Sequence, residues 1–221
     1  VYVKVNMNRE DSKILLKEIY EDIVLPNSSP QGMEKYLTDN LAIDITFDLV
    51  LKEELLRAEL ISAPLTILIL LFVFGTVVSA SLPALSGIYT VIAAVGIIHG
   101  LTYVVDDLTV YAVNIVSLLG IGLSVDYSLF IVNRFREELG RGHDKRTAIA
   151  MTSATAGRAI LFSGLTVIAG LTGMLFFENT GLPSLGWGGI CATLVALTSS
   201  VILLPSILAI LGDRINSGRV P

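Results

Sequence analysis

Charged residues, cysteine and histidine are scarce in this sequence, and each shortage narrows the possible functions. Charged residues make up 16% of the 221 residues, the net charge is -5, and there are one cysteine and two histidines. A single cysteine excludes a framework of internal disulfides, and two widely separated histidines do not have the spacing of a metal site. The acidic balance argues against a nucleic-acid-binding protein. The hydrophobic content of 53% argues against a disordered chain.

The shortage of charge is concentrated in part of the chain. Residues 1–59 carry 19 of the 35 charged residues. Residues 60–133 contain only three, and residues 159–212 contain only Glu178. The three are Asp106, Asp107 and Asp126. Because about 20 apolar residues are the length of a bilayer-spanning helix, these stretches predict a mainly α, polytopic membrane protein.

Five apolar spans follow a polar segment. The polar segment, residues 1–58, begins with the alternation of a strand and continues with helical spacing of apolar residues, which predicts a small α+β unit. The chain begins with Val1 and shows no signal-peptide pattern, so we expect it to start inside a longer polypeptide. A helical bundle is predicted over residues 59–213. Its five transmembrane helices are predicted at residues 60–79, 85–104, 110–133, 159–177 and 185–211.

Basic residues gather in the connections on one side of this predicted bundle. The connection of residues 134–158 contains six Lys or Arg residues and the tail of residues 214–221 contains two. The connections on the other side contain none. Loops rich in Lys and Arg face the cytoplasm. We therefore predict a multi-pass protein of the cytoplasmic membrane, with residues 134–158 and the tail in the cytoplasm and residues 1–58 outside it.

Asp126 is the one carboxylate predicted to lie deep in the membrane. It precedes Arg134 by eight residues, about 12 Å along a helix. With Arg134 at the cytoplasmic edge of the bilayer, Asp126 lies near its middle. An ionised Asp there costs about 3 kcal/mol, so the carboxyl must be protonated, paired or hydrated. Two interpretations remain open: Asp126 stays protonated and only hydrogen-bonds a neighbouring helix, or it binds and releases protons.

Helical geometry indicates what surrounds Asp126. Gly122 and Phe130 lie on the same face of the predicted helix. Gly122 has no side chain and allows another helix to approach closely, so we predict that this face contacts protein and not lipid. Tyr127 is adjacent and offers a hydroxyl that can donate to the carboxylate. The remaining residues of the face are Ile115, Leu119 and Asn133.

The segment GIGLSVDYSLFIVNRFREEL resembles the signature of the mycobacterial-membrane-protein-large (MmpL) family, which belongs to the resistance-nodulation-division (RND) superfamily of proton-driven exporters. LLRAELISAPLTILILLFVFGTVVSASLP resembles the family's second helix, TSATAGRAILFSGLTV its fifth, and LPSLGWGGICATLVALTSSVILLPSILAILGDRI its sixth. The resemblance covers about residues 41–216. It implies that the five spans are helices two to six of an RND-type bundle. It also implies that residues 1–58 are the end of an extracytoplasmic porter domain.

The resemblance also implies roles for individual residues. Asp126 and Tyr127 would form half of a proton relay, with Gly122 packing beside it and Phe130 lining the same region. Ser163 falls where the family's fifth helix places a small polar side chain beside the Asp-Tyr pair. The chain would belong to a secondary transporter and not an enzyme, with the proton as coupling ion and no other cofactor. Its cargo would be lipids, other hydrophobic compounds or drug-like compounds.

Two departures from the family pattern leave alternatives open. The family usually has glycine where this chain has Asp39, in YLTDN before the second helix. The family's relay also uses two Asp-Tyr pairs, whereas this chain has one. The partner of Asp126 is therefore expected from a second repeat of the same polypeptide or from another protomer. The competing hypothesis is a non-transporting, lipid-sensing or scaffolding membrane module related to sterol-sensing domains. Either protein would have the lipid bilayer and a lipid or hydrophobic small molecule as partners, and no nucleic acid.

Overall fold

Helices make up nearly all of the described structure. The computed structural model describes residues 15, 40–105, 108–177 and 181–218. Most of the predicted α+β unit, Asp39 included, lies outside these residues. The longer helices are α2 (Asn40–Phe74), α3 (Val77–Leu101), α4 (Val110–Gly140), α5 (Lys145–Thr152), α6 (Arg158–Thr172), α7 (Leu182–Thr198) and α8 (Leu204–Leu211).

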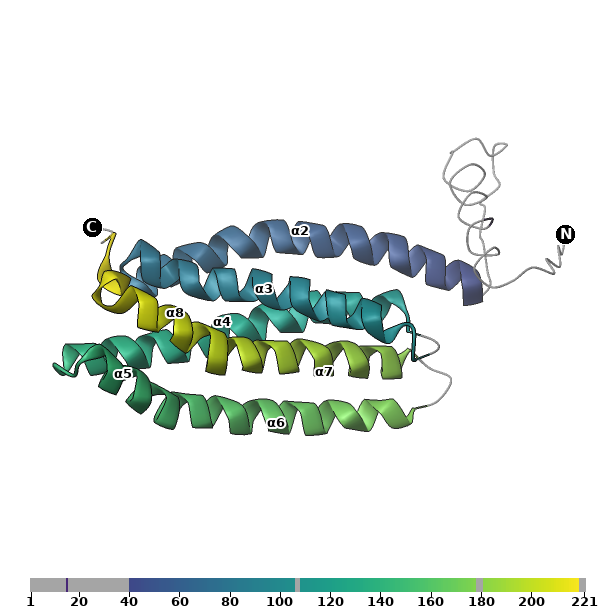
Figure 1. Ribbon diagram of the computed structural model, residues 1–221. Helices are drawn as coiled ribbons and strands as arrows, with labels where there is room; N and C mark the ends of the chain where they lie inside the picture. Colours follow the sequence, from purple (N-terminus) through teal and green to yellow (C-terminus); the bar gives the residue numbers. More distant parts are fainter. Residues whose placement is uncertain (1–14, 16–39, 106–107, 178–180, 219–221) are drawn as a thin grey trace, which may run out of the picture. The chain divides into compact units, whose positions relative to one another are not determined.

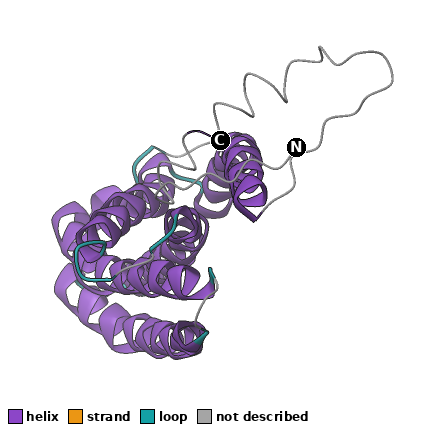
Figure 2. Ribbon diagram, turned by 90° about the vertical axis from the view of Figure 1, so that its right-hand side faces the viewer, coloured by secondary structure: helices purple, strands orange, loops and turns teal. Residues whose placement is uncertain are grey.

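The chain divides into two units, and the division falls inside α2. The first unit is Val1–Ala63 and the second is Pro64–Pro221. In the second unit, the helices run side by side and are joined by loops at their ends (Figures 1 and 2). No strand occurs among the residues described in either unit.

Short irregular turns join several helices into longer ones. The π-helical turn η2 (Ser153–Gly157) connects α5 to α6, and η4 (Ser199–Leu203) connects α7 to α8. Pro205 is the second residue of α8, which begins directly after η4. A proline has no backbone N–H to donate to the preceding turn, so a widened π turn just before it relieves the missing hydrogen bond. The 3₁₀ turns η3 (Gly173–Phe176) and η5 (Gly212–Asn216) end these helices.

The helices have the length and composition of membrane spans. Four helical segments in the described part of the chain are long and apolar enough to cross a bilayer, which confirms the polytopic helical class. They are Val77–Leu101, Tyr111–Gly140, Lys145–Phe176 and Leu182–Leu211. A fifth apolar stretch, Leu60–Phe74 at the end of α2, is shorter. It lies where the first of the five spans was predicted.

The structure differs from the sequence prediction in where the first two spans meet. The predicted connection between residues 79 and 85 lies inside α3, and the chain turns instead at Gly75 and Thr76. Gly75 has a φ angle of +62°, a left-handed conformation that glycine adopts without a steric penalty. α4 also continues past residue 133 to Gly140. The predicted connection of residues 134–158 is therefore mostly helical.

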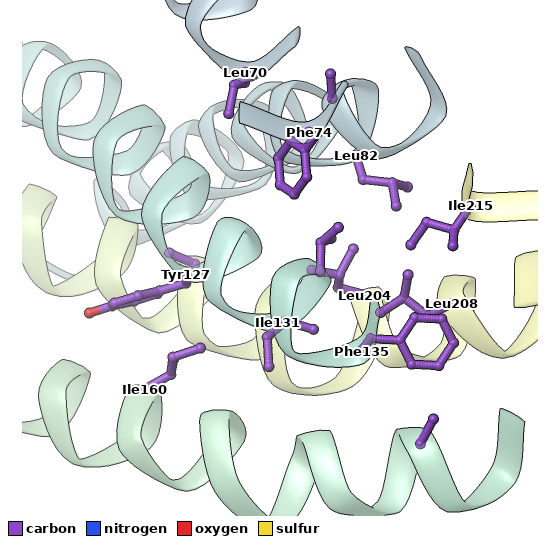
Figure 3. Close-up of a cluster of buried hydrophobic side chains, with 14 of the residues drawn as sticks. Leu70, Phe74, Leu82, Tyr127, Ile131, Phe135, Ile160, Leu204, Leu208 and Ile215 are labelled. Atoms are coloured by element: carbon purple, nitrogen blue, oxygen red, sulfur yellow. The ribbon is translucent and has the colours of Figure 1, made fainter. Parts of the chain in front are cut away.

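α4 packs against both α3 and α7 and holds the bundle together. Its C-terminal half contributes Ile131 and Phe135 to a cluster of buried side chains that also includes Leu204 and Leu208 of α8 (Figure 3). In its N-terminal half, small residues bring the helices close. A Cβ atom on Gly188 of α7 would overlap the main-chain carbonyl oxygen of Ala112 on α4. Close packing of small residues is the usual way in which membrane helices associate.

Hydroxyl pairs add polar contacts between the spans. Thr90 of α3 and Ser124 of α4 share a hydrogen bond of 2.5 Å. Ser86 of α3 and Ser199 of η4 share one of 2.9 Å. All four side chains are buried. In an apolar environment, such bonds satisfy groups that would otherwise be unpaired, so they fix how α3 sits against its neighbours.

Candidate functional site

α4 presents Asp126 on a face that the described part of the chain leaves uncovered. Asp126 is exposed, as are Gly122, Phe130 and Asn133 on the same side of the helix. Phe130 has 61% of its surface exposed, and a Cβ atom on Gly122 would meet nothing within 4 Å. We call these four residues the open face. The prediction that this face contacts protein is not met within the described residues, so the contact would have to come from residues outside them.

Tyr127 points away from the open face into the bundle. Only 5% of its surface is exposed, and it belongs to the same buried cluster as Ile160 of α6 (Figure 3). Its hydroxyl oxygen is buried and has no hydrogen-bond partner among the residues that the structure describes. The donation from Tyr127 to Asp126 that the sequence suggested is therefore absent from this structure, because successive residues on a helix point about 100° apart. A buried unpaired hydroxyl costs about 1–3 kcal/mol.

Ser163 lies on α6 and is exposed, like the open face. The next residue, Gly164, is buried where α6 meets α7, and a Cβ atom there would lie 2.5 Å from the side chain of Leu197. Ser163 consequently points away from α7. Within the described residues, no hydrogen bond joins Ser163 to Asp126 or Tyr127. The placement of Ser163 beside the Asp-Tyr pair therefore stays a prediction.

Several buried hydroxyls near Asp126 were missed by the sequence reasoning. Ser124 and Ser128 lie two residues to either side of Asp126 and are fully buried. Ser124 bonds Thr90, whereas the hydroxyls of Ser128 and of Ser200 in η4 have no partner. The signal was available, because two serines four residues apart in an apolar span lie on one helix face. These groups place buried hydroxyls inside the bundle, on α4 and on η4.

A compact ion cluster ends α4. Glu138 is fully buried and lies 2.5 Å from an Arg134 nitrogen, 2.9 Å from an Arg141 nitrogen and 3.4 Å from Nε2 of His143. Glu137 pairs with the same two arginines. All of these contacts lie within α4 and the turn after it. Two of the six basic residues that predicted the orientation are thus neutralised locally, and the cluster stabilises the end of the helix that carries Asp126.

Asp144 starts the next helix by capping it. Its carboxylate accepts a hydrogen bond of 3.2 Å from the backbone N–H of Arg146. The Thr147 hydroxyl, followed by backbone N–H groups, lowers the pKa of this exposed carboxyl below its ordinary value. Asp144 is therefore a helix cap and not part of the open face.

The sequence of the chain is similar to those of known membrane proteins. The sequence profile of the MMPL family matches residues 2–219. The chain is similar to the mycolic acid-containing lipids exporter MmpL11 of Mycolicibacterium smegmatis, with 37% identity over 188 residues, which are 85% of this chain and 20% of that protein. It is similar to the trehalose monomycolate exporter MmpL3 of Mycobacterium tuberculosis, with 38% identity over 161 residues, 73% of this chain and 17% of that protein.

A third relative has a different kind of cargo. The heme uptake protein MmpL11 of Mycobacterium tuberculosis is 37% identical over 158 residues, which are 72% of this chain and 16% of that protein. The chain spans about a fifth of the length of these curated relatives.

Proposed function

The chain belongs to the MMPL family of the RND superfamily, and on that premise we propose that it is part of a transporter driven by the proton gradient. The transporter moves lipids or other hydrophobic compounds across the cytoplasmic membrane. Asp126 is its proton-binding carboxyl, and Tyr127 assists the transfer. The proton is the coupling ion.

The observation that carries this proposal is the position of Asp126 on the open face. A carboxyl within a membrane span is stable when neutral and becomes ionised only when it meets water or a cation. On the open face it is within reach of whatever helix covers that face. Binding a proton makes Asp126 neutral, ends its pairing with that helix and lets the two helices move apart. Releasing the proton to the other side restores the pairing.

Tyr127 supports the same proposal from the buried side. Its hydroxyl is an unsatisfied donor and acceptor next to the carboxyl. A modest rotation of α4 or of the tyrosine side chain brings such a group towards a water molecule or a partner helix. A hydroxyl that accepts one proton while donating another can pass a proton to a carboxylate without becoming charged itself. The polar serines beside it extend this environment.

The open face also indicates what completes the site. A second repeat of the same polypeptide, or another protomer, covers Gly122, Asp126 and Phe130 and supplies the second half of the relay. The short share of each relative that the chain spans supports the first of these sources. Gly122 permits the covering helix to approach closely.

The relatives support a hydrophobic cargo. Their names refer to mycolic acid-containing lipids, trehalose monomycolate and heme, all of which have large apolar parts. Every one of these names describes a transporter, which favours transport over the alternative of a lipid-sensing or scaffolding module. Drug-like compounds share the apolar character and extend the proposed range of cargo.

The test replaces Asp126 by Asn in the full-length protein and measures export in cells. Asp126→Asn keeps the shape of the side chain and removes its titration, so export should fall at least tenfold at unchanged protein abundance. Asp144→Asn is the matched control, because Asn still caps a helix and Asp144 lies outside the span. Export that persists in Asp126→Asn would show that this carboxyl is not the coupling site.

A further inference from the structure

Arg136 joins three parts of the bundle that are far apart in the sequence. It lies on α4, and its Nη1 donates to the main-chain carbonyl of Phe74 at 2.8 Å. Its Nε donates to Oδ1 of Asn216 at 3.0 Å. The guanidinium carbon lies 5.8 Å from the centre of the Phe74 ring. One side chain therefore links α4 to the last residue of α2 and to the last residue of η5.

The acceptor on α2 is a group that needs a partner. The last carbonyl groups of a helix receive no hydrogen bond from an N–H group of the same helix. Phe74 is the residue at which α2 ends. The Phe74 side chain is buried, so the end of α2 is held by both a hydrogen bond and a cation-ring contact. A charged donor makes the hydrogen bond stronger than one between neutral groups.

The segment after α8, residues 212–218, is hydrogen-bonded to the start of α3, next to Phe74 in the sequence. Ser79 of α3 donates to the main-chain carbonyl of Ile215 at 2.8 Å, and the backbone N–H of Val77 donates to that of Gly218 at 3.0 Å. Ile215 is fully buried. Asn216 is consequently a fixed point for Arg136 and not a free end of the chain.

The other arginines at this end of α4 do not make such links. Arg134 and Arg141 pair with Glu137 and Glu138, which lie three or four residues away on α4 itself. Those pairs stabilise one helix. Arg136 is distinct because it donates to groups on two other elements.

Arg136 stands on the same continuous helix as Asp126, ten residues away, which is about 15 Å. A helix moves as a stiff body over this distance, so a displacement of α4 around Asp126 also displaces Arg136. Within the unit that contains α4, α2 runs from residue 64 to Phe74. A displacement of Phe74 thus acts on this part of α2.

We propose that Arg136 is the positioning residue that transmits movement of α4 to α2. This inference rests on the proposed function, since it assumes that a change in the charge of Asp126 moves α4. Arg136 does not touch the proton or the cargo. It acts by holding Phe74 and Asn216 in fixed positions relative to α4.

The test uses the full-length protein with Arg136→Met, which removes both hydrogen bonds, and Arg136→Lys, which retains the charge but has no planar fork to reach two acceptors. Arg146→Met is the matched control, because Arg146 is an exposed arginine of α5. Two quantities are measured: export per molecule of protein, and the distance between spin labels at Leu65 of α2 and Leu165 of α6, which changes when α2 moves together with α4. Both labelled positions are exposed, and Cys191 is replaced by Ser.

Asp126→Asn should shift the distance between the labels in an otherwise wild-type protein. We expect no such shift when Arg136→Met is present, and at least a tenfold loss of export by Arg136→Met. Arg136→Lys should be intermediate, and Arg146→Met should match the wild type. A purely structural role for Arg136 would reduce abundance and export together and would leave the shift intact in the molecules that fold.

The proposal is overturned if Arg136→Met accumulates normally and either exports within twofold of the wild type or retains the full shift. If Arg136→Met does not accumulate, Arg136→Lys and Asn216→Ala decide, and a full shift with both variants also overturns it. Normal export by Asp126→Asn would instead contradict the proposed function itself. An inactive Asp126→Asn without any distance shift would contradict only the role of Arg136.

Discussion

Asp126 and Tyr127 are neighbours in the sequence but occupy opposite environments. Asp126 lies on the open face, and the Tyr127 hydroxyl is buried without a partner. This separation follows from the helical turn of about 100° per residue. The pair is consequently incomplete among the described residues, and each member needs a further group or a movement of α4. Both residues are therefore expected to matter for transport more than for folding.

Tyr127→Phe separates these two roles. The substitution removes a buried unpaired hydroxyl, so the thermal midpoint should rise, by about 2–4 °C for each kcal/mol recovered, while transport should fall because the proton path loses a group. Tyr103→Phe is the control, since Tyr103 is highly exposed at the end of α3. Thermal melts and transport assays on the same preparations provide the comparison. Equal transport by the two variants would argue against any part for Tyr127.

Contacts between the helices depend on small residues at particular positions. Gly188 of α7 lies directly against Ala112 and Ile115 of α4, whereas Gly122 of α4 has free space beside it. Both glycines occur in apolar spans, and each has another glycine within two residues of it. What differs is whether this chain places another helix against them. The same residue type is thus structural at one site and available to a partner at the other.

Gly188→Ala should destabilise the bundle by about 1–3 kcal/mol, because the added methyl group overlaps the backbone of α4. Gly122→Ala provides the control within this chain, since the same methyl group meets empty space. Denaturation in detergent, followed by circular dichroism, measures the difference. A lower stability for Gly122→Ala than for Gly188→Ala would show that the α4–α7 contact is described wrongly.

The start of α5 should respond to acid through Asp144. The pKa of this carboxyl is lowered by the Thr147 hydroxyl and the backbone N–H groups. The cap is therefore fully effective above the ordinary pKa of Asp, and its contribution is lost as the pH falls through the lowered pKa. Hydrogen exchange of the first turn of α5 should increase in strong acid. Asp144→Ala should show the increased exchange at neutral pH and little further change in acid, whereas an unaltered acid response would contradict the assignment.

At the scale of the whole molecule, the sequence predicted the membrane class and the five apolar stretches because long runs without charge leave few alternatives. It misplaced the first turn because Ser-Ala-Ser-Leu-Pro carries stronger local turn signals than Gly75 and Thr76. That turn is fixed by contacts with Ile215 and Gly218, which local patterns do not reveal. Helical spacing grouped the four residues of the open face, but it also placed Ile115 on that face, and Ile115 lies against Gly188 of α7. Their partner could not be predicted, since no described residue covers that face.

The open face predicts where bulk will harm the assembled transporter. Gly122→Leu should lower export in the full-length protein without lowering abundance, because the side chain blocks the helix that covers this face. Gly96→Leu is the matched control, as Gly96 of α3 is also exposed with free space beside it. Export assays at equal protein levels distinguish the two. Unchanged export with both variants would indicate that the open face meets lipid.

The most direct test of proton coupling through Asp126 is proton flux in liposomes that contain the purified full-length protein. A pH gradient is imposed, and cargo movement and internal pH are recorded together. The wild type and Asp144→Asn should move cargo only with the gradient and dissipate it as cargo moves. Asp126→Asn should do neither. Cargo movement that is independent of the gradient in the wild type, or unchanged coupling in Asp126→Asn, would contradict a proton-driven mechanism at this residue.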